Sequence, residues 1–562
     1  MPFILNAQFS LKISGDNETL IKELKYIKNH KSKAEALIEL TKVLNEVQNK
    51  GYLLAETDTS SSTNELTGNI RFGKSFKWLY LKPGNLNPVL ASKIGYSENS
   101  FKNKAFNSKQ YLALKEKIIV YFENNGYPFA SVSLDSIEIN DNEIKATLNV
   151  EKNKFFKVDS VVIIGNAKIN NSFINRYISV IPGKPYNEGN IKSIGPKILQ
   201  LPFLIQTQAQ QVRLTEKTNK VVLFLNKKNA SQFDGIIGVQ PDNLTGKTII
   251  TGDVKIKLVN GILHNAETFD LEWRRLQQQT QDFKGKFIYP YMFGTAFGSD
   301  YSLKIYKRDT TFIDINNDFG LHYYFSGLNY IKVQLKQRQS NLLSTSGLEN
   351  ATTLPSYADV SSNLNGFGVF YEKLDYRFNP KKGISVQINA SAGTKKIRKN
   401  PRINENAYNN LALFSAQYVY DAVINGYLQL KGNNVLRIGI QSASIFGNAP
   451  VFKNELLRIG GLKTLRGFDE ESIFTSFYAI PTIEYRFVFS QNSCLLAFAE
   501  GAFYENNSFG TYVKDIPISF GTGINLETKA GILSINYALG SQFNQGIDAR
   551  NGKIHFGLTA LF

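Results

Sequence analysis

Side chains that could act as nucleophiles or metal ligands are few in this chain of 562 residues. Cys494 is the only cysteine, so neither an internal disulfide nor a thiolate zinc cluster is possible. The histidines are scattered along the chain, at His30, His264, His322 and His555. Neither the G-x-S-x-G turn of serine hydrolases nor the H-E-x-x-H helix of zinc proteases occurs. We therefore expect no enzyme, no catalytic residue, no metal and no cofactor.

The composition excludes a disordered chain and favours a folded protein with a basic surface. Hydrophobic residues make up 42% of the sequence, aromatic residues make up 12%, and the formal net charge is +18. The N-terminal lysines lack the interleaved aromatic side chains that stack on bases, so we expect a solvated surface and no nucleic-acid partner. No apolar run has the length of about 18 residues that a membrane-spanning helix needs, although a membrane-spanning strand needs only about 10.

The N-terminal part of the chain contains a repeat of about 75 residues. A helical pattern over 34–48 stops at Gly51, and a similar pattern over 109–124 stops at Gly126. A weaker third copy follows, and the unit reads β-α-α-β-β. After a signal-peptide remnant at 1–8, the expected units are 9–75, 76–154 and 155–229. A cytoplasmic N-terminal strand is the alternative interpretation of residues 1–8.

Residues 230–562 lose the helical period and become alternating segments separated by Gly, Asn, Asp and Ser. Ile331, Val333 and Leu335 alternate with polar residues, so one face of this strand is apolar and the other is charged. A soluble sandwich would turn the charged face to water, whereas a transmembrane barrel turns it to the lumen. We expect a transmembrane antiparallel β-barrel of about 16 strands. Two polar stretches, 337–366 and 395–410, suit extracellular loops.

The last strand alternates as well, with Phe556, Leu558 and the terminal Phe562 on its apolar face. This pattern resembles the C-terminal recognition signal of bacterial outer-membrane proteins.

Several segments carry a resemblance to known families. The third repeat, with its Val161-Val162-Ile163-Ile164-Gly165-Asn166 strand, resembles the polypeptide-transport-associated (POTRA) domain. Three segments of the barrel region resemble motifs of the BamA/TamA family, whose members join POTRA domains to a bacterial surface antigen barrel. These segments are Phe287–Gly294, Asp375–Gly383 and Leu457–Phe468. In the last one, Thr464 and Leu465 stand where the family commonly has Ser and Val.

The resemblance implies that the motif Leu465-Arg466-Gly467-Phe468 lies in a long extracellular loop that folds back into the lumen. Gly467 would then form a tight turn, and Phe468 would pack on the lumen wall. An arginine in a narrow lumen needs anionic partners, because a buried unpaired charge is costly. A surface loop with a solvated arginine is the alternative.

Glu484 and Glu500 are the expected luminal partners of Arg466. They lie on the next two predicted strands and look like acidic positions of the family. Apolar neighbours flank each of them, so strand alternation turns both carboxylates away from lipid.

The resemblance implies a factor in the bacterial outer membrane, with its POTRA domains in the periplasm, that inserts or translocates outer-membrane proteins. It would act without nucleotide, by pairing its strands with those of client proteins. Its partners would be client outer-membrane proteins, possible periplasmic assembly proteins and membrane lipid. Two alternatives stay open: a two-partner-secretion-type transporter that exports a dedicated protein, and a passive porin or surface adhesin.

Deletion of Phe562 should lower the amount of the protein in the outer membrane, because it removes the end of the recognition strand. The measurement is heat-modifiable migration of membrane fractions in SDS gels, which reports a closed barrel. A chain that is soluble in the cytoplasm and unaffected by the deletion would contradict the export of this protein.

Overall fold

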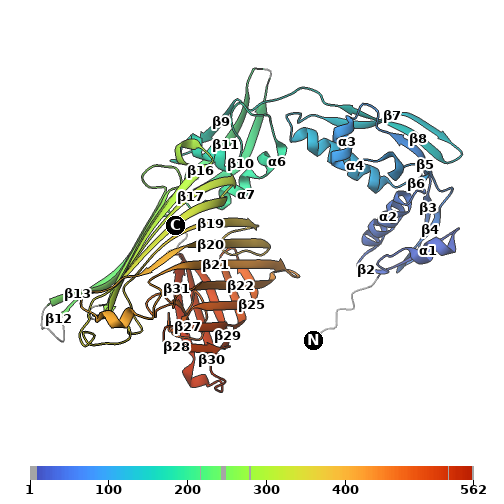
Figure 1. The fold of residues 1–562 in the computed structure, drawn as a ribbon. Helices are drawn as coiled ribbons and strands as arrows, with labels where there is room; N and C mark the ends of the chain where they lie inside the picture. The colour runs from blue at the N-terminus through green and yellow to red at the C-terminus, as the bar shows by residue number, and fades with distance from the viewer. Residues whose placement is uncertain (1–8, 216, 242–247, 278–279, 529–530, 560–562) are drawn as a thin grey trace. The chain divides into compact units, whose positions relative to one another are not determined.

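The computed structural model describes residues 9–215, 217–241, 248–277, 280–528 and 531–559 (Figure 1). Two sequence predictions, the signal-peptide remnant at 1–8 and the terminal Phe562, lie outside the described residues. The chain forms two compact units. One contains the chain up to Val158 together with Gly183–Gly189, and the other contains Asp159–Pro182 and the chain from Asn190 onward. Within the described residues, no helix has the length and apolar character needed to cross a membrane.

The first repeat is a four-stranded sheet, ordered β2-β1-β4-β3, with two helices. The long helix α2 starts at the Ser32 cap, whose hydroxyl accepts a hydrogen bond from the backbone N–H of Glu35. Its buried face consists of Ala36, Leu40, Val43 and Val47. The elements are β1 Phe9–Gly15, α1 Glu18–Glu23, β2 Asn29–His30, α2 Lys33–Asn49, β3 Glu56–Ser61 and β4 Glu65–Arg71.

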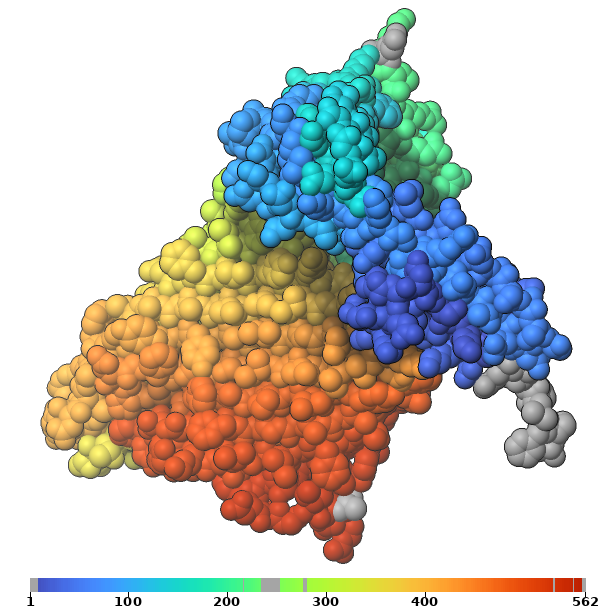
Figure 2. All heavy atoms as spheres, turned by 90° about the vertical axis from the view of Figure 1, so that its right-hand side faces the viewer, coloured from blue at the N-terminus to red at the C-terminus, as the bar shows by residue number. Residues whose placement is uncertain are grey.

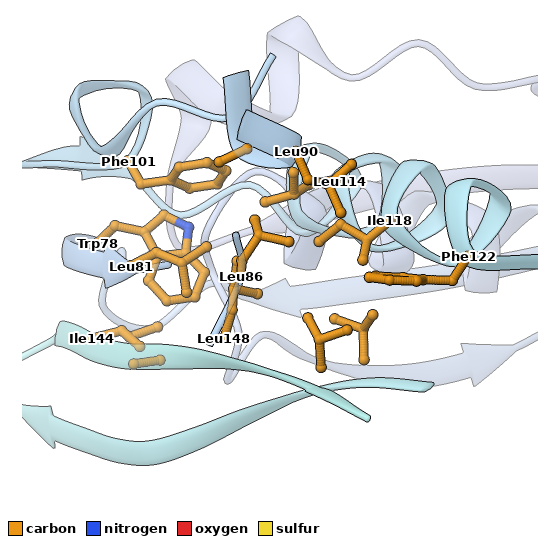
Figure 3. Packing of buried hydrophobic residues seen from close by; sticks show 14 of the residues in the cluster. Trp78, Leu81, Leu86, Leu90, Phe101, Leu114, Ile118, Phe122, Ile144 and Leu148 are labelled. Carbon is orange, nitrogen blue, oxygen red and sulfur yellow. The ribbon is translucent and has the colours of Figure 1, made fainter. Parts of the chain in front are cut away.

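The second repeat has the same plan, with its sheet ordered β6-β5-β8-β7. Figure 3 shows side chains from the helices and from the sheet meeting in one core around Trp78, which is fully buried. Trp78 packs edge-on against Phe101, with ring centroids 6.1 Å apart. The elements are β5 Lys77–Lys82, α3 Pro88–Ile94, β6 Lys104–Ala105, α4 Ser108–Glu123, β7 Ser131–Asn140 and β8 Glu143–Glu151.

The third repeat is a three-stranded sheet, ordered β10-β11-β9, with three short helices. The strand β11 pairs in parallel with β9 and antiparallel with β10. The elements are β9 Ser160–Ile164, α5 Asn171–Tyr177, α6 Glu188–Lys192, α7 Ile194–Leu199, β10 Leu204–Leu214 and β11 Asn219–Lys227. The predicted β-α-α-β-β order is found with two differences: a short additional strand in each of the first two copies, and three helices in place of two in the third. The exact domain boundaries stay a prediction.

The remaining strands form one antiparallel sheet that runs from β12 to β31 in chain order. Neighbouring strands of this sheet follow one another in the sequence, and Figure 2 accordingly shows its surface in successive bands from yellow through orange to red. The first eight strands are β12 Gln232–Pro241, β13 Thr248–Val259, β14 Thr268–Gln277, β15 Thr280–Tyr289, β16 Phe297–Arg308, β17 Phe312–Ser326, β18 Asn329–Leu342 and β19 Val360–Leu374. The others are β20 Gly383–Ile397, β21 Phe414–Gln429, β22 Asn434–Gly447, β25 Phe477–Ser490, β26 Ser493–Gly501, β27 Phe503–Ser508, β28 Thr511–Asp515, β29 Ile518–Thr528, β30 Gly531–Ser541 and β31 Lys553–Thr559.

The number of strands in this sheet, which we call the barrel wall, agrees with the prediction of about 16. Within the described residues the sheet has eighteen segments. β26 and β27 both pair with β25, while β28 pairs with β27 and β29 pairs with β26. β26 and β27 are therefore two parts of one interrupted strand, and β28 and β29 are two parts of the next. Counted in this way, the described wall contains sixteen strands. The predicted fold, POTRA-like repeats followed by an antiparallel barrel of about 16 strands, is confirmed.

Side chains alternate between the two faces of the wall as predicted. On β18 the side chains of Ile331, Val333 and Leu335 are about half exposed, whereas Gln334 is buried on the inner face. Water does not favour a continuous apolar outer face, but lipid does. The predicted loop 337–366 was wrong at both ends, because β18 continues to Leu342 and β19 begins at Val360. The predicted loop 395–410 was wrong at its start, because β20 continues to Ile397. The backbone ladder extends past the apolar band, since strand pairing does not require apolar side chains.

Trp78→Ala should destabilise the second repeat by about 3 to 5 kcal/mol, because it empties the centre of that core. The measurement is urea-dependent protease resistance of the first unit in the full-length protein. Val89→Ala is the matched control, since this side chain on α3 is 78% exposed. Equal resistance of the two variants would contradict the role of Trp78 in the core.

Candidate functional site

A long loop between β22 and β25 carries the predicted arginine motif. It contains a short hairpin, β23 Leu457–Ile459 paired with β24 Ile473–Thr475. Between these strands, Gly460 and Gly461 have φ of +114° and +91°, a backbone conformation that favours glycine. The hydroxyl of Thr464 donates to the carbonyl of Gly460 over 2.9 Å and accepts from its N–H over 2.8 Å. Thr464 therefore closes the turn that presents Arg466.

The structure brings Arg466, Glu484 and Glu500 together. The backbone N–H of Arg466 donates to Glu500 over 2.9 Å, and its Nε donates to the same carboxylate over 2.8 Å. Its Nη1 donates to Glu484 over 2.8 Å. The side chains of all three are at least nine-tenths buried. The arginine thus holds both carboxylates at once, through Nε and Nη2 to Glu500 and Nη1 to Glu484, and an ammonium group cannot reproduce this planar fork of donors.

Three further residues complete this cluster and were not predicted. Arg486 donates to Glu484 over 2.7 Å, and Arg437 lies 3.4 Å from the same carboxylate. The guanidinium carbon of Arg466 lies 3.4 Å above the ring centroid of Phe498, a cation–π contact. Strand parity could have revealed Arg486, which is two residues from Glu484. Arg437 is the cross-strand partner of Glu484, so finding it requires the register of β22 and β25.

The neighbours of Arg466 in the motif fasten the loop to the wall. Leu465 is fully buried in a cluster with residues of β25 and β27. Gly467 has a φ of +87°, and its N–H donates to the ring of His555 on β31 over 3.1 Å. Phe468 is buried, and a Cβ on Gly540 of β30 would lie 2.8 Å from its ring. Gly540 therefore leaves the space that the Phe468 ring fills.

The second motif, Asp375–Gly383, forms the connection between β19 and β20. The carboxylate of Asp375 accepts from the backbone N–H groups of Lys381 and Lys382, over 3.0 and 3.1 Å. Gly383 has a φ of +120° and starts the next strand. The motif is thus a closed turn stabilised by its own aspartate.

The third motif, Phe287–Gly294, is one of the points at which the third repeat contacts the sheet. Tyr291 is buried, stacks on Tyr324 with ring centroids 4.7 Å apart, and meets Phe173 of α5 edge-on at 5.7 Å. Arg176 of α5 donates to the carbonyl of Gly294 over 3.0 Å. This turn therefore joins the helical face of the repeat to the end of the sheet.

The comparisons with known proteins agree with this architecture. A sequence profile of the Omp85 superfamily domain matches residues 264–562. The chain belongs to the Omp85 superfamily. This match confirms the family that the three motifs predicted. No curated protein matches the sequence.

Solved structures of similar fold have low sequence identity to this Omp85 chain. CdiB from Acinetobacter baumannii is 12% identical with a TM-score of 0.50, and the match covers 83% of this chain and 86% of that one. CdiB from Escherichia coli is 13% identical with a TM-score of 0.49, covering 93% and 96%. BamA from Haemophilus ducreyi lacking POTRA domains 1–3 is 15% identical with a TM-score of 0.42, covering 85% and 98%.

The structure describes only the first part of the predicted C-terminal recognition signal, up to Thr559. Phe556 lies on the outer face of β31 with 68% of its surface exposed. The backbone of Leu558 pairs with Leu533 of β30, while the side chain of Leu558 and the whole of Phe562 lie outside the described residues. The role of this strand as a recognition signal stays a prediction.

One segment fits the sequence pattern of a phosphate-binding P-loop but has a different structure. Residues Gly68–Ser75 read G-N-I-R-F-G-K-S. A P-loop follows a strand and leads into a helix, whose N-terminal N–H groups hold the phosphates. Here Gly68 lies within β4, between β1 and β3, and the next element is the strand β5. The segment is therefore the end of strand β4, up to Arg71, followed by the connection that leads to β5.

Candidate ligand groups outside the arginine cluster are sparse. Among the described residues, no group of three or more His, Cys, Asp or Glu side chains is placed to hold a metal ion. Cys494 is buried on the inner face of β26.

Arg466→Ala should release the loop and destabilise the barrel by about 3 to 5 kcal/mol, because Glu500 is left buried without its cation. Arg466→Lys should restore only part of this, since lysine lacks the bidentate fork. The measurement is protease sensitivity of the loop from outside the cell. The double variant Arg466→Ala/Glu500→Gln should be more stable than the single variant, because it removes the stranded charge.

Lys463→Ala is the matched control, since this cation lies in the same loop and is exposed. If Arg466→Ala is as protected as Lys463→Ala, the anchoring role of Arg466 is wrong.

Proposed function

We propose that this protein inserts or translocates client polypeptides at the bacterial outer membrane, without nucleotide and without catalysing a reaction. Membership of the Omp85 superfamily supports the general role. The observation that carries the proposal is the order of the large sheet, in which β12 and β31 stand at the two ends. A client strand can pair with an end strand through main-chain hydrogen bonds.

The seam between β12 and β31 is suited to opening. Gly235 and Gly238 lie in β12, and glycine contributes no side-chain packing to a strand and loses more entropy on ordering. The first strand of the sheet is therefore packed less firmly than a strand of larger side chains would be.

The POTRA-like repeats supply further edges. β7 is the end strand of the second sheet and β10 is that of the third. Both are long, at ten and eleven residues, and β10 is interrupted by register shifts around Gln208. We propose that these edges, facing the periplasm, receive extended client segments or periplasmic assembly proteins.

Locking the seam tests the mechanism. In a Cys494→Ala background, cysteine pairs placed between residues 233–239 and 554–557 should crosslink and block client insertion reversibly. The matched control is Val333→Cys/Phe367→Cys, a pair of directly opposed residues on β18 and β19, away from the ends of the sheet. Crosslinking of this pair should leave insertion unchanged. Full insertion with the seam locked would contradict entry of clients at this seam.

Depletion of the protein tests the class of function. An insertion factor should lower the abundance of several other barrels in the outer-membrane proteome. Loss of a single secreted protein would instead indicate a dedicated transporter, and altered solute uptake alone would indicate a porin.

A further inference from the structure

A cavity of about 450 Å³ lies at the end of the barrel wall that meets the third repeat. It is lined by 200–203, the connection between α7 and β10, and by side chains from the strands β13 to β20. Its volume is within the range of about 300 to 1,000 Å³ that is usual for ligand sites. The cavity therefore has room for a ligand between the repeat and the lumen.

Positive charge exceeds negative charge in the lining of this cavity. Four cationic side chains face two carboxylates there, which are Lys257, Lys286, Lys332 and Arg377 against Asp270 and Asp300. Arg377 already has a carboxylate partner, since it lies 3.4 Å from Glu372. Within the described part of the chain, none of the three lysines forms an ion pair. These lysines are therefore available to an anionic ligand.

Asp300 is held in the wall by a histidine. Its carboxylate accepts a hydrogen bond from Nε2 of His322, a side chain that is 3% exposed. The other ring nitrogen of His322 shares a hydrogen bond of 3.0 Å with the hydroxyl of Tyr324. The ring of His322 also stacks on Tyr330, with centroids 4.1 Å apart. Asp300 is thus fixed in a buried network and forms no ion pair with a lysine of the cavity.

Lys286 and Lys332 lie close enough to interact electrostatically. Each attracts Asp300, and the two ammonium groups repel each other. Lys286 of β15 is the cross-strand neighbour of Asp270, and Lys332 of β18 is that of His322. An anion bound between the two lysines relieves their repulsion and accepts charge-assisted hydrogen bonds from both.

Apolar side chains line another part of the cavity. Leu201 and Phe203, in the connection from α7 to β10, are at most 4% exposed, and Ile288 of β15 also lines the space. A small inorganic anion leaves this apolar lining unused, whereas a polypeptide brings carboxylates and apolar side chains together. The connection leads directly into β10, an end strand of the third sheet. A segment paired with the first residues of β10 therefore has the cavity beside it.

We propose that this cavity, which we call the basic cavity, binds an acidic side chain of a client polypeptide through Lys286 and Lys332. The inference rests on the proposed function and adds the chemistry of the client segment, which carries carboxylates among apolar residues. Lys257, the neighbour of Asp270 on its other side, attracts further acidic residues of the segment. Because these contacts are electrostatic, salt weakens the binding.

Fluorescence anisotropy with the purified full-length protein tests the basic cavity. The probes are two labelled peptides of serine, threonine and valine, one with interspersed glutamates and the other with glutamines at the same positions. The wild type should bind the glutamate peptide at least about tenfold more tightly, and Lys286→Gln/Lys332→Gln should abolish this preference. Lys373→Gln is the matched control and should keep it, since this exposed lysine stands at an outward position of β19.

A photoreactive group in the glutamate peptide locates the bound segment. We expect labelling of 200–203 or of Tyr330, and loss of this labelling in Lys286→Gln/Lys332→Gln. Equal affinity of the wild type for the two peptides would overturn the basic cavity. Labelling confined to the first two repeats would overturn it as well, and neither result requires the variant to fold.

The failure of this inference and the failure of the proposed function are different outcomes. Equal peptide affinities, together with a loss of other barrels on depletion, would remove the basic cavity and leave the proposed function. Unchanged barrels on depletion would contradict client insertion. A glutamate preference that the lysine variant loses would still establish the site in the cavity.

Discussion

Backbone hydrogen bonding is the constraint on which the C-terminal unit depends. A strand whose outer face meets lipid cannot give its N–H and C=O groups to water, so every strand must find a neighbour. A long antiparallel sheet meets this demand, and its pleat then divides the side chains into an apolar outer face and a polar inner face. The alternation around Ile331 and Gln334 is one instance of that division. Charged residues gather in the lumen because the outer face excludes them.

The luminal charges in turn demand pairing, and this explains the arginine loop. Glu484 meets three guanidinium groups, from Arg437, Arg466 and Arg486, and Arg466 brings Glu500 into the same cluster. Two carboxylates and three arginines give the cluster one excess positive charge, and the ring of Phe498 adds a cation–π contact to Arg466. Two further buried ion pairs lie where the start of the same loop contacts the wall. They join Lys395 to Glu455 and Arg338 to Asp314. A loop with buried polar groups at both ends has a defined place in the barrel without regular secondary structure of its own.

The three repeats depend instead on small hydrophobic cores between their helices and their sheets. Each is small, so two or three helices pack on a short sheet whose end strands keep an unpaired edge. In the second repeat the core is centred on Trp78, and in the third it continues into the contact of Phe173 with Tyr291. Strand edges in small domains of this kind are open to pairing, which a protein that handles unfolded chains can use.

The sequence by itself determined the class of each element, because the patterns that reveal helices and strands are local. The helix of the first repeat was predicted within one residue at each end, because its helical period lies in the sequence itself. Which side of that helix meets the sheet, with Ala36 buried and Leu37 exposed, is set by packing between the elements. The pairing of Arg466 with Glu484 and Glu500 could be anticipated. Strand alternation placed both carboxylates on the luminal face, and the family motif placed the arginine in a loop that folds into the lumen.

Only the tertiary structure decided which side chains from distant strands meet. Arg437 reaches Glu484 because β22 and β25 pair in one register, across an intervening loop of about 30 residues. Lys395 and Glu455 are separated by sixty positions, and nothing in their local sequence marks either as buried. The segment Gly68–Ser75 shows the converse, because its sequence pattern is typical of phosphate binding, yet its first four residues pair as part of β4 and no helix follows. Local propensity follows from the residues near one another in the chain, whereas burial and pairing follow from the register of the whole sheet.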